Sequence, residues 1–224
     1  MLPLAKPNLN SKTLEYTIEW IKTNWISSQG HFVADFEVAM TNYLKVRHAI
    51  ACSSGTTALH LALCALEIDC ADDVIVPSFT FIATANIVKY CSAEPILCDV
   101  DSKTFCIDVE DAGRRITSRT AVIIPVYING HHGDIEAVLE LALDRGLHIV
   151  EDACQALGGN YGSHKLGTTG SIGCFSFFAN KQLTTGEGGM CVTNSDELAE
   201  KIRTLRNHGR NKEHRSEYVH DVIG

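Results

Sequence analysis

The strongest constraint on the fold of this chain is a series of short segments that are apolar along their whole length and alternate with helical patterns. Apolar runs typical of buried strands occupy residues 48–52, 73–76, 95–100, 120–126, 147–151, 172–177 and 190–193. Helical spacing of apolar residues predicts helices at 11–25, 36–44, 57–66, 81–90, 135–144 and 195–207. Strands that are apolar on both faces need cover on both faces. The sequence therefore predicts an α/β fold, with a mainly parallel sheet and helices on both of its faces.

Length and charge narrow the class of protein. The chain has 224 residues, which is long enough for one large domain with a full hydrophobic core. Its formal net charge is −8, and no segment is rich in Lys and Arg, so nucleic acid or an anionic membrane is not expected as the main partner. No signal peptide or bilayer-spanning run is visible, and we therefore expect a cytoplasmic protein.

The cysteines and histidines raise the question of disulfides or a metal. The chain has nine cysteines, none in a C-x-x-C pair, and many of them lie inside apolar runs. Buried free thiols in a reducing compartment are the favoured interpretation. The ten histidines show no metal-ligand spacing among themselves. The sequence thus predicts no metal site.

Polar residues follow several predicted strands, and these are the candidate ligand-binding positions, because parallel sheets bind ligands at the carboxyl ends of their strands. The first group is the Ser53–Thr57 turn between a strand and a helix. Gly55 permits a close backbone approach, and the helix N-terminus attracts a phosphate. An ordinary strand-to-helix turn remains the alternative for this segment.

A second group is the acidic pair Glu151 and Asp152, at the end of the predicted strand 147–151. Alternation of side chains along a strand places the two on opposite faces, so only one is expected to face the site. An N-cap for the following segment is the alternative role for Asp152.

The third group is Lys181, in a small polar loop that follows an apolar strand and ends in Gly186–Gly189. Burial lowers the pKa of a lysine and makes its amine nucleophilic. A surface lysine followed by a tight glycine turn is the alternative. Taken together, the three groups fit pyridoxal phosphate (PLP), which needs a lysine for its aldehyde, an acid for its pyridine nitrogen and a cup for its phosphate.

With these motifs the chain resembles the DegT/DnrJ/EryC1/StrS family of PLP-dependent sugar aminotransferases, which have the aspartate-aminotransferase-like type I PLP fold. The resemblance runs from about residue 6 to the end, and the motifs that carry it lie at residues 25–30, 54–59, 77–81, 151–156 and 175–190. Asn180-Lys181 and the segment 184–190 most resemble the perosamine synthase branch of the family.

The resemblance implies a role for each site residue. Lys181 would bind the cofactor aldehyde covalently and shuttle the proton, and Asp152 would pair with the pyridine nitrogen. Gln155 would lie near the ring O3′. The remaining implied cofactor contacts are Ser176, Gly55 and Thr56 for the phosphate and Phe81 for the face of the ring.

The resemblance also implies the reaction. An amino group would pass, in a ping-pong mechanism, from glutamate to a nucleotide-linked 4-keto-6-deoxyhexose, with a GDP-linked sugar as the expected substrate and a homodimer as the expected assembly. The alternatives are a 3-keto-sugar aminotransferase and a non-catalytic PLP- or sugar-nucleotide-binding protein. Family members that dehydrate sugars have histidine where this chain has Lys181.

The expected domain organisation is an N-terminal arm and helix at residues 1–30, followed by a PLP-binding large domain at residues 31–224. In the family, an Asn/Arg-containing segment that binds phosphate across the dimer, and a small C-terminal domain, lie beyond the position of Gly224. From the resemblance we expect the large domain to be C-terminally incomplete, and residues 1–224 alone to bind PLP weakly and to transaminate inefficiently.

Overall fold

The computed structural model describes residues 5–25, 27–28, 30–210 and 223–224. Seven strands form the main sheet in the order β1-β9-β8-β5-β4-β2-β3. Neighbours from β8 to β3 pair in parallel, whereas β9 is antiparallel to both β1 and β8. Only β9 therefore runs against the other six, and the predicted mainly parallel sheet is confirmed.

The strands lie where the apolar runs predict them. Their bounds are β1 His48–Cys52, β2 Asp73–Pro77, β3 Glu94–Cys98, β4 Thr120–Ile123, β5 His148–Asp152, β8 Ile172–Ser176 and β9 Gly189–Thr193. Every residue of β2 and β9 is buried, as expected for strands covered on both sides.

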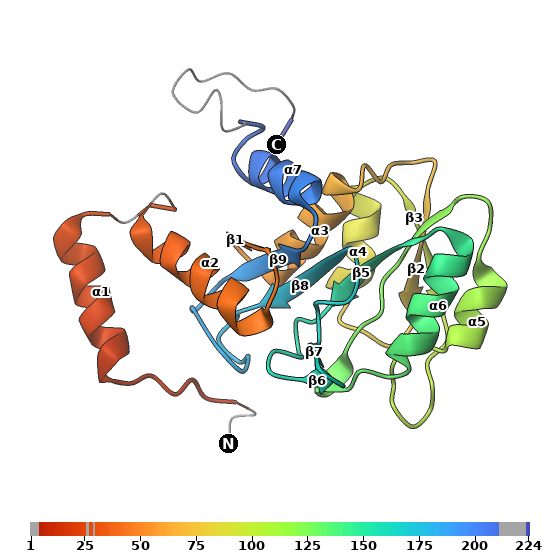
Figure 1. Cartoon of the computed structure of the whole chain (residues 1–224), viewed down its shortest axis with the longest axis horizontal. Coiled ribbons are helices and arrows are strands. Elements are labelled where there is room, and N and C mark those ends of the chain that lie inside the picture. The colour runs from red at the N-terminus through yellow and green to blue at the C-terminus, as the bar shows by residue number, and fades with distance from the viewer. Residues whose placement is uncertain (1–4, 26, 29, 211–222) are drawn as a thin grey trace.

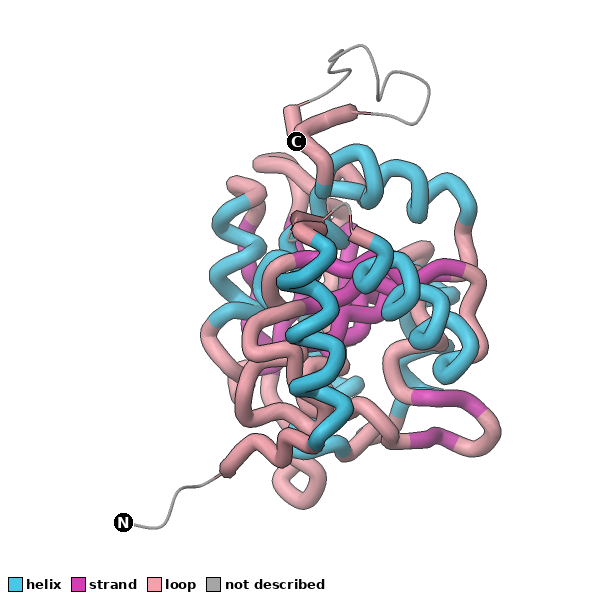
Figure 2. The backbone as a smooth tube through the Cα atoms, turned by 90° about the vertical axis from the view of Figure 1, so that its left-hand side faces the viewer, coloured by secondary structure: helices cyan, strands magenta, loops and turns pink. Residues whose placement is uncertain are grey.

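Three helices cover one face of the sheet: α3 Gly55–Ala65, α4 Ala83–Tyr90 and α7 Asp196–Arg206. Their apolar residues share one core cluster with alternate strand residues, among them Val74, Val76 and Val122. Figure 2 shows the strands running between helices on either side. Ser195 caps α7 by accepting the Leu198 N–H, as its position in the sequence predicts.

The opposite face is covered by α2 His31–Leu44, α5 Val109–Arg115 and α6 Ile135–Arg145. The intervening strand residues point to this side. Ile75, Ile123 and Ile149 pack in a cluster with α5 and α6. Helices thus lie on both faces, and the period-2 alternation of side chains assigns each strand residue to one of the two faces of the sheet.

Helix α1, Ser11–Thr23, lies apart from the sheet beyond α2 (Figure 1). It begins where predicted, since the Asn10 side chain accepts the Thr13 N–H at 3.1 Å. None of its residues is buried, and its ring contact to α2 joins Tyr16 to Phe32, with centroids 6.0 Å apart. No helix in the described ranges has the length and apolarity needed to cross a membrane.

Several short elements were not predicted, or end earlier than predicted. The apolar pattern of the sequence did not predict α5, the 3-10 turn η1 Ile128–Gly130 or the hairpin β6 Asn160–Tyr161 with β7 His164–Lys165. The predicted strand 120–126 is too long, because regular pairing stops at Ile123. Pro125 has no N–H to donate to the ladder, although its carbonyl accepts the Asp152 N–H at 2.9 Å.

A buried carboxylate fixes the loop that follows β7. Glu151 is fully buried, and it accepts hydrogen bonds from the Tyr127 hydroxyl and from the backbone N–H groups of residues 167, 169 and 170. Burial raises the pKa of Tyr127 well above its usual range, and the neighbouring Glu151 charge raises it further. Tyr127 therefore stays protonated and donates, so four donors hold one carboxylate.

Glu151→Gln should lower the free energy of unfolding by about 2–4 kcal/mol, because hydrogen bonds to a charged group are worth roughly 1.5–3 kcal/mol and an amide nitrogen cannot accept the donors it would face. Urea unfolding followed by circular dichroism measures this. The matched control is Glu94→Gln, whose exposed ion pair with Lys89 should contribute no more than about 1 kcal/mol. Equal effects of the two substitutions would contradict the structural role of Glu151.

Candidate active site

A cavity of about 430 Å³ opens at the carboxyl edge of the sheet, between the N-terminus of α3, the start of α4 and the loop after β8. The structure brings all seven sequence-predicted site residues to its wall: Gly55, Thr56, Phe81, Asp152, Gln155, Ser176 and Lys181. They come from four separate segments of the chain. The position of this cavity is the one expected for a parallel sheet.

The N-terminus of α3 forms one wall. Ser54 caps the helix by accepting the Thr57 N–H at 3.1 Å, and the Thr57 hydroxyl accepts the Ser54 N–H at 2.9 Å. The first-turn N–H groups of Gly55 and Thr56 have no intrahelical acceptor and lie at the positive end of the helix. A phosphate at this wall would meet backbone donors and the Ser176 side chain.

Gly55 is required by close packing at this wall. A Cβ atom placed on it would lie 2.7 Å from Cys154 Sγ and 2.8 Å from Ser176 Cβ. Both contacts are shorter than real Cβ atoms make, so any larger residue would push the neighbouring strand ends away from α3. The close approach of α3 to β8 thus depends on the missing side chain.

Asp152 supplies the buried charge of the cavity. Its side chain is 5% exposed and accepts hydrogen bonds from the Thr84 hydroxyl at 2.8 Å and from the Cys154 N–H at 3.2 Å. No ion pair joins it to any other residue that the structure describes. Burial of an uncompensated carboxylate is costly, and a cationic ligand group in the cavity would offset that cost.

Glu151, the neighbouring carboxylate, does not face this cavity. It belongs to the opposite side of β5, where it binds Tyr127 and the 167–170 loop. The expectation that only one of the two acids faces the site is therefore confirmed, and the one that faces it is Asp152.

The loop after β8 carries Lys181 at the cavity. The backbone N–H of Lys181 donates to the Phe178 carbonyl at 3.0 Å. The loop closes where the backbone N–H of Thr185 donates to the Phe177 carbonyl, also at 3.0 Å. Lys181 is half-buried. Gln182 ties the loop to the segment after β5 by donating from Nε2 to the Gln155 carbonyl at 2.7 Å.

Gln155 and Phe81 line the cavity in less constrained ways. The Gln155 side-chain oxygen accepts the Asn129 N–H at 2.9 Å, which fixes the orientation of its amide. Phe81 is 68% exposed, so its ring lies at the mouth of the cavity with little contact to the rest of the described chain.

Sequence reasoning missed Thr84, Glu187 and Cys154 as lining residues. Thr84 is fully buried, and its hydroxyl lies 2.9 Å from the hydroxyl of Thr80, which precedes α4 by three residues. A threonine pair at this spacing beside a ligand edge was an available signal. Burial raises the pKa of the Cys154 thiol well above its usual range, with the Asp152 charge adding to it, so this thiol stays neutral.

The residues at this cavity fit PLP. They offer an amine on Lys181, a buried carboxylate without an ion pair on Asp152 and a helix N-terminus that a Cβ at Gly55 would crowd. An aromatic ring, Phe81, stands at the mouth. In the same order, these groups could bind the PLP aldehyde, pair with its protonated ring nitrogen, bind its phosphate and stack on its ring.

Comparison with known proteins points the same way. The DegT/DnrJ/EryC1/StrS aminotransferase family matches residues 7–224. A GDP-perosamine synthase from Caulobacter vibrioides is 46% identical over the whole chain, which covers 60% of that protein. A UDP-N-acetyl-3-dehydro-alpha-D-glucosamine 3-aminotransferase from Acidithiobacillus ferrooxidans is 47% identical over 80% of the chain, covering 48% of that protein.

Solved structures agree in fold. An aminotransferase from Psychrobacter cryohalolentis superposes with a TM-score of 0.92 at 31% identity, covering 98% of this chain and 58% of that one. DesV from S. venezuelae, in complex with a ketimine intermediate, gives 0.86 at 37% identity, with 98% and 61% covered. These neighbours are PLP aminotransferases of the type I fold, so the predicted fold class is confirmed. The chain spans about 60% of the length of the first of its curated relatives.

Gly55→Ala should weaken PLP binding roughly tenfold, because overpacking a tight contact commonly costs about 1–3 kcal/mol and here pushes the N-terminus of α3 away from Cys154 and Ser176. The change in absorbance on titration with PLP measures the affinity. Gly113→Ala is the matched control. Gly113 lies on α5, and a Cβ there would meet only the Leu141 side chain on α6, at an ordinary contact distance of 3.7 Å. Unchanged affinity in Gly55→Ala, with Gly113→Ala also unchanged, would remove the α3 N-terminus from the cofactor site.

Proposed function

The chain belongs to the DegT/DnrJ/EryC1/StrS aminotransferase family, and on that premise we propose that it catalyses PLP-dependent transfer of an amino group to a nucleotide-linked keto-sugar. The observation that carries the proposal is the presence of Lys181 and the buried Asp152 in the wall of one cavity at the carboxyl edge of the sheet. Neither residue alone would indicate this chemistry.

Lys181 is the proposed catalytic base. When bound, PLP supplies an electron sink for the carbanion formed at the Cα of an amino donor. The Lys181 amine would hold the cofactor through its aldehyde. As a free amine it would be placed to take the Cα proton, because its closed loop keeps Lys181 at the wall of the same cavity.

Asp152 is the proposed partner of the ring nitrogen. Its carboxylate is buried, so the attraction between it and a protonated ring nitrogen is stronger than it would be in water. The hydrogen bond from Thr84 fixes one carboxylate oxygen at 2.8 Å and leaves the group pre-oriented. Preorganised charge of this sort supplies a large part of many enzymatic rate enhancements.

The remaining predicted residues are proposed to hold the cofactor. Gly55 and Thr56 would bind its phosphate through their N–H groups, together with Ser176. Phe81 would lie against the ring face, and Gln155 near its O3′. All five line the same cavity as Lys181.

The proposed acceptor is a GDP-linked 4-keto-6-deoxyhexose, with glutamate as the amino donor in a ping-pong mechanism. The similarity to the GDP-perosamine synthase of Caulobacter vibrioides, 46% over the whole chain, supports this choice. A 3-keto sugar nucleotide is the second candidate, supported by the 47% identical 3-aminotransferase. We also propose that residues 31–224 belong to the PLP-binding large domain and that the whole protein acts as a homodimer.

Borohydride reduction of the PLP-bound protein should fix the cofactor on Lys181, and Lys181→Ala should abolish that adduct, because no other amine is expected to reach the cofactor aldehyde. Peptide mapping by mass spectrometry locates the modified residue. Lys89→Ala is the control, since Lys89 is exposed and pairs with Glu94. Reduced cofactor on any lysine other than 181 would contradict the assignment.

Asp152→Asn separates covalent attachment of the cofactor at Lys181 from activation of its ring by the Asp152 carboxylate. It should retain the adduct on Lys181 and slow the glutamate half-reaction by about 10²–10³, the loss typical of one preorganised electrostatic contact. The half-reaction is followed by its absorbance change. A near-normal rate would mean that Asp152 does not contact the ring nitrogen.

The acceptor is tested with two sugar nucleotides. The whole protein incubated with glutamate should aminate a GDP-linked 4-keto-6-deoxyhexose in preference to a UDP-linked 3-keto sugar, and mass spectrometry of the products decides between them. Amination of the 3-keto compound alone would favour the second candidate. Cofactor binding without amination of either compound would favour a binding protein.

A further inference from the structure

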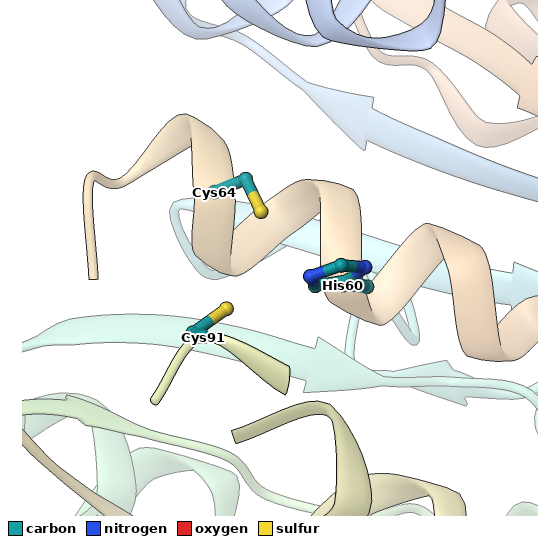
Figure 3. Close-up of side chains that lie close together, drawn as sticks. All are labelled: His60, Cys64 and Cys91. Atoms are coloured by element: carbon teal, nitrogen blue, oxygen red, sulfur yellow. The ribbon is translucent and has the colours of Figure 1, made fainter. Parts of the chain in front are cut away.

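Three side chains with metal-binding atoms meet on α3 and at the end of α4, outside the cavity that contains Lys181. His60 and Cys64 are four residues apart on α3, so both lie on the same side of the helix. Cys91 is the C-cap residue of α4. One ligand atom of each lies within 4.8 Å of the other two. Figure 3 shows Cys91 below α3, with its sulfur directed up toward the helix.

The donor set selects the kind of ion. Two sulfurs and one imidazole nitrogen suit borderline-soft ions such as Zn²⁺, whereas Mg²⁺ and Ca²⁺ require oxygen ligands. Around a tetrahedral zinc, with Zn–S near 2.3 Å and Zn–N near 2.0–2.1 Å, ligand atoms are separated by roughly 3.5–3.8 Å. The observed upper limit of 4.8 Å differs from that separation by about 1 Å, which small side-chain rotations can cover.

The scaffold beneath the three side chains is rigid. Helices α3 and α4 pack in the same core cluster on one face of the sheet. The Cys91 N–H donates to the carbonyls of Ile87 and Val88 at 3.3 and 3.1 Å, which fixes the backbone of the third ligand. The His60 ring packs edge-on against Tyr90, with centroids 5.8 Å apart.

Partial exposure leaves room for a further ligand. His60, Cys64 and Cys91 are all half-buried, so solvent reaches the cluster. Three protein ligands with the fourth position open to water is a common arrangement for protein-bound zinc. No metal was predicted from the sequence because the spacings among the histidines and the spacings among the cysteines were considered separately. A mixed pair such as His60 and Cys64, four residues apart, belongs to neither set.

We propose that His60, Cys64 and Cys91 form a binding site for a divalent ion of the zinc class, with water completing the coordination. The two sulfurs bind as thiolates, so their protons are released to solvent on binding. The ion would tie the C-terminal half of α3 to the end of α4. None of the three residues lines the Lys181 cavity, so the metal site and the proposed transamination can each fail without the other.

Titration of the reduced protein with Co²⁺ tests the site, because cobalt bound by thiolates gives charge-transfer absorption in the near ultraviolet and tetrahedral cobalt absorbs in the visible. Both bands should appear and then vanish when Zn²⁺ is added. Cys64→Ser, Cys91→Ser and His60→Phe should each weaken binding at least about 100-fold, since losing even an outer partner of a ligand costs about 10–100-fold. His60→Phe keeps a ring against Tyr90.

Cys70→Ser and His132→Gln are the matched controls and should bind cobalt as the unsubstituted protein does. Cys70 is an exposed free thiol a few residues beyond α3, and His132 lies in a different part of the fold. Binding unchanged in Cys64→Ser and Cys91→Ser, or lost equally in Cys70→Ser, would overturn the proposal.

A measurement on the unsubstituted protein guards against variants that fail to fold. Zn²⁺ should slow the alkylation of Cys64 and Cys91 by iodoacetamide by at least about tenfold while Cys70 reacts at its usual rate, as read by peptide mass spectrometry. Equal alkylation of Cys64 and Cys91 with and without Zn²⁺ would also overturn the proposal, as would a Cys64–Cys91 disulfide that forms in place of the complex.

Discussion

Two consecutive carboxylates at the end of β5 point to opposite faces of the sheet, and the rest of the structure depends on that alternation. Glu151 is held by Tyr127 and by three backbone N–H groups. A slip of one residue in β5 would move this charge to the other face and leave its four donors without an acceptor. The register that satisfies Glu151 is the same register that turns Asp152 into the cavity.

The cavity is built by parallel strands that end at the same edge. The chain leaves β1, β5 and β8 there, and each exit contributes a different function: helix N–H groups near Gly55, the buried charge of Asp152 and the loop amine of Lys181. Because β8 lies beside β5, the carboxylate and the loop that carries the lysine are brought to one place by a single strand pairing. Close contact of α3 with β8 requires that position 55 have no side chain.

Helix α3 connects the Lys181 cavity with the proposed metal site. Its first turn borders the Lys181 cavity, and His60 and Cys64 in its second half face Cys91 at the end of α4. An ion bound only by the folded protein would stabilise it by RT ln(1 + [ion]/Kd), and so would a cofactor bound at the first turn. The two ligands would therefore stabilise the same helix through separate contacts.

The sequence by itself determined the strands of the main sheet, most helices and the α/β class, because apolar periodicity is a local signal. Polar residues after strands indicated the segments of Gly55, Asp152 and Lys181, and the family resemblance supplied the full set of seven candidate site residues. The sequence could not assign α5, the β6–β7 hairpin or the early end of β4, whose signals are short or depend on one proline. Only the tertiary structure showed that Thr84 orients Asp152, 68 residues further along the chain. Likewise, only the packing of α4 on α3 brought Cys91 to His60 and Cys64. Contacts between segments distant in sequence depend on how helices pack on the sheet, and no local pattern of residues encodes that geometry.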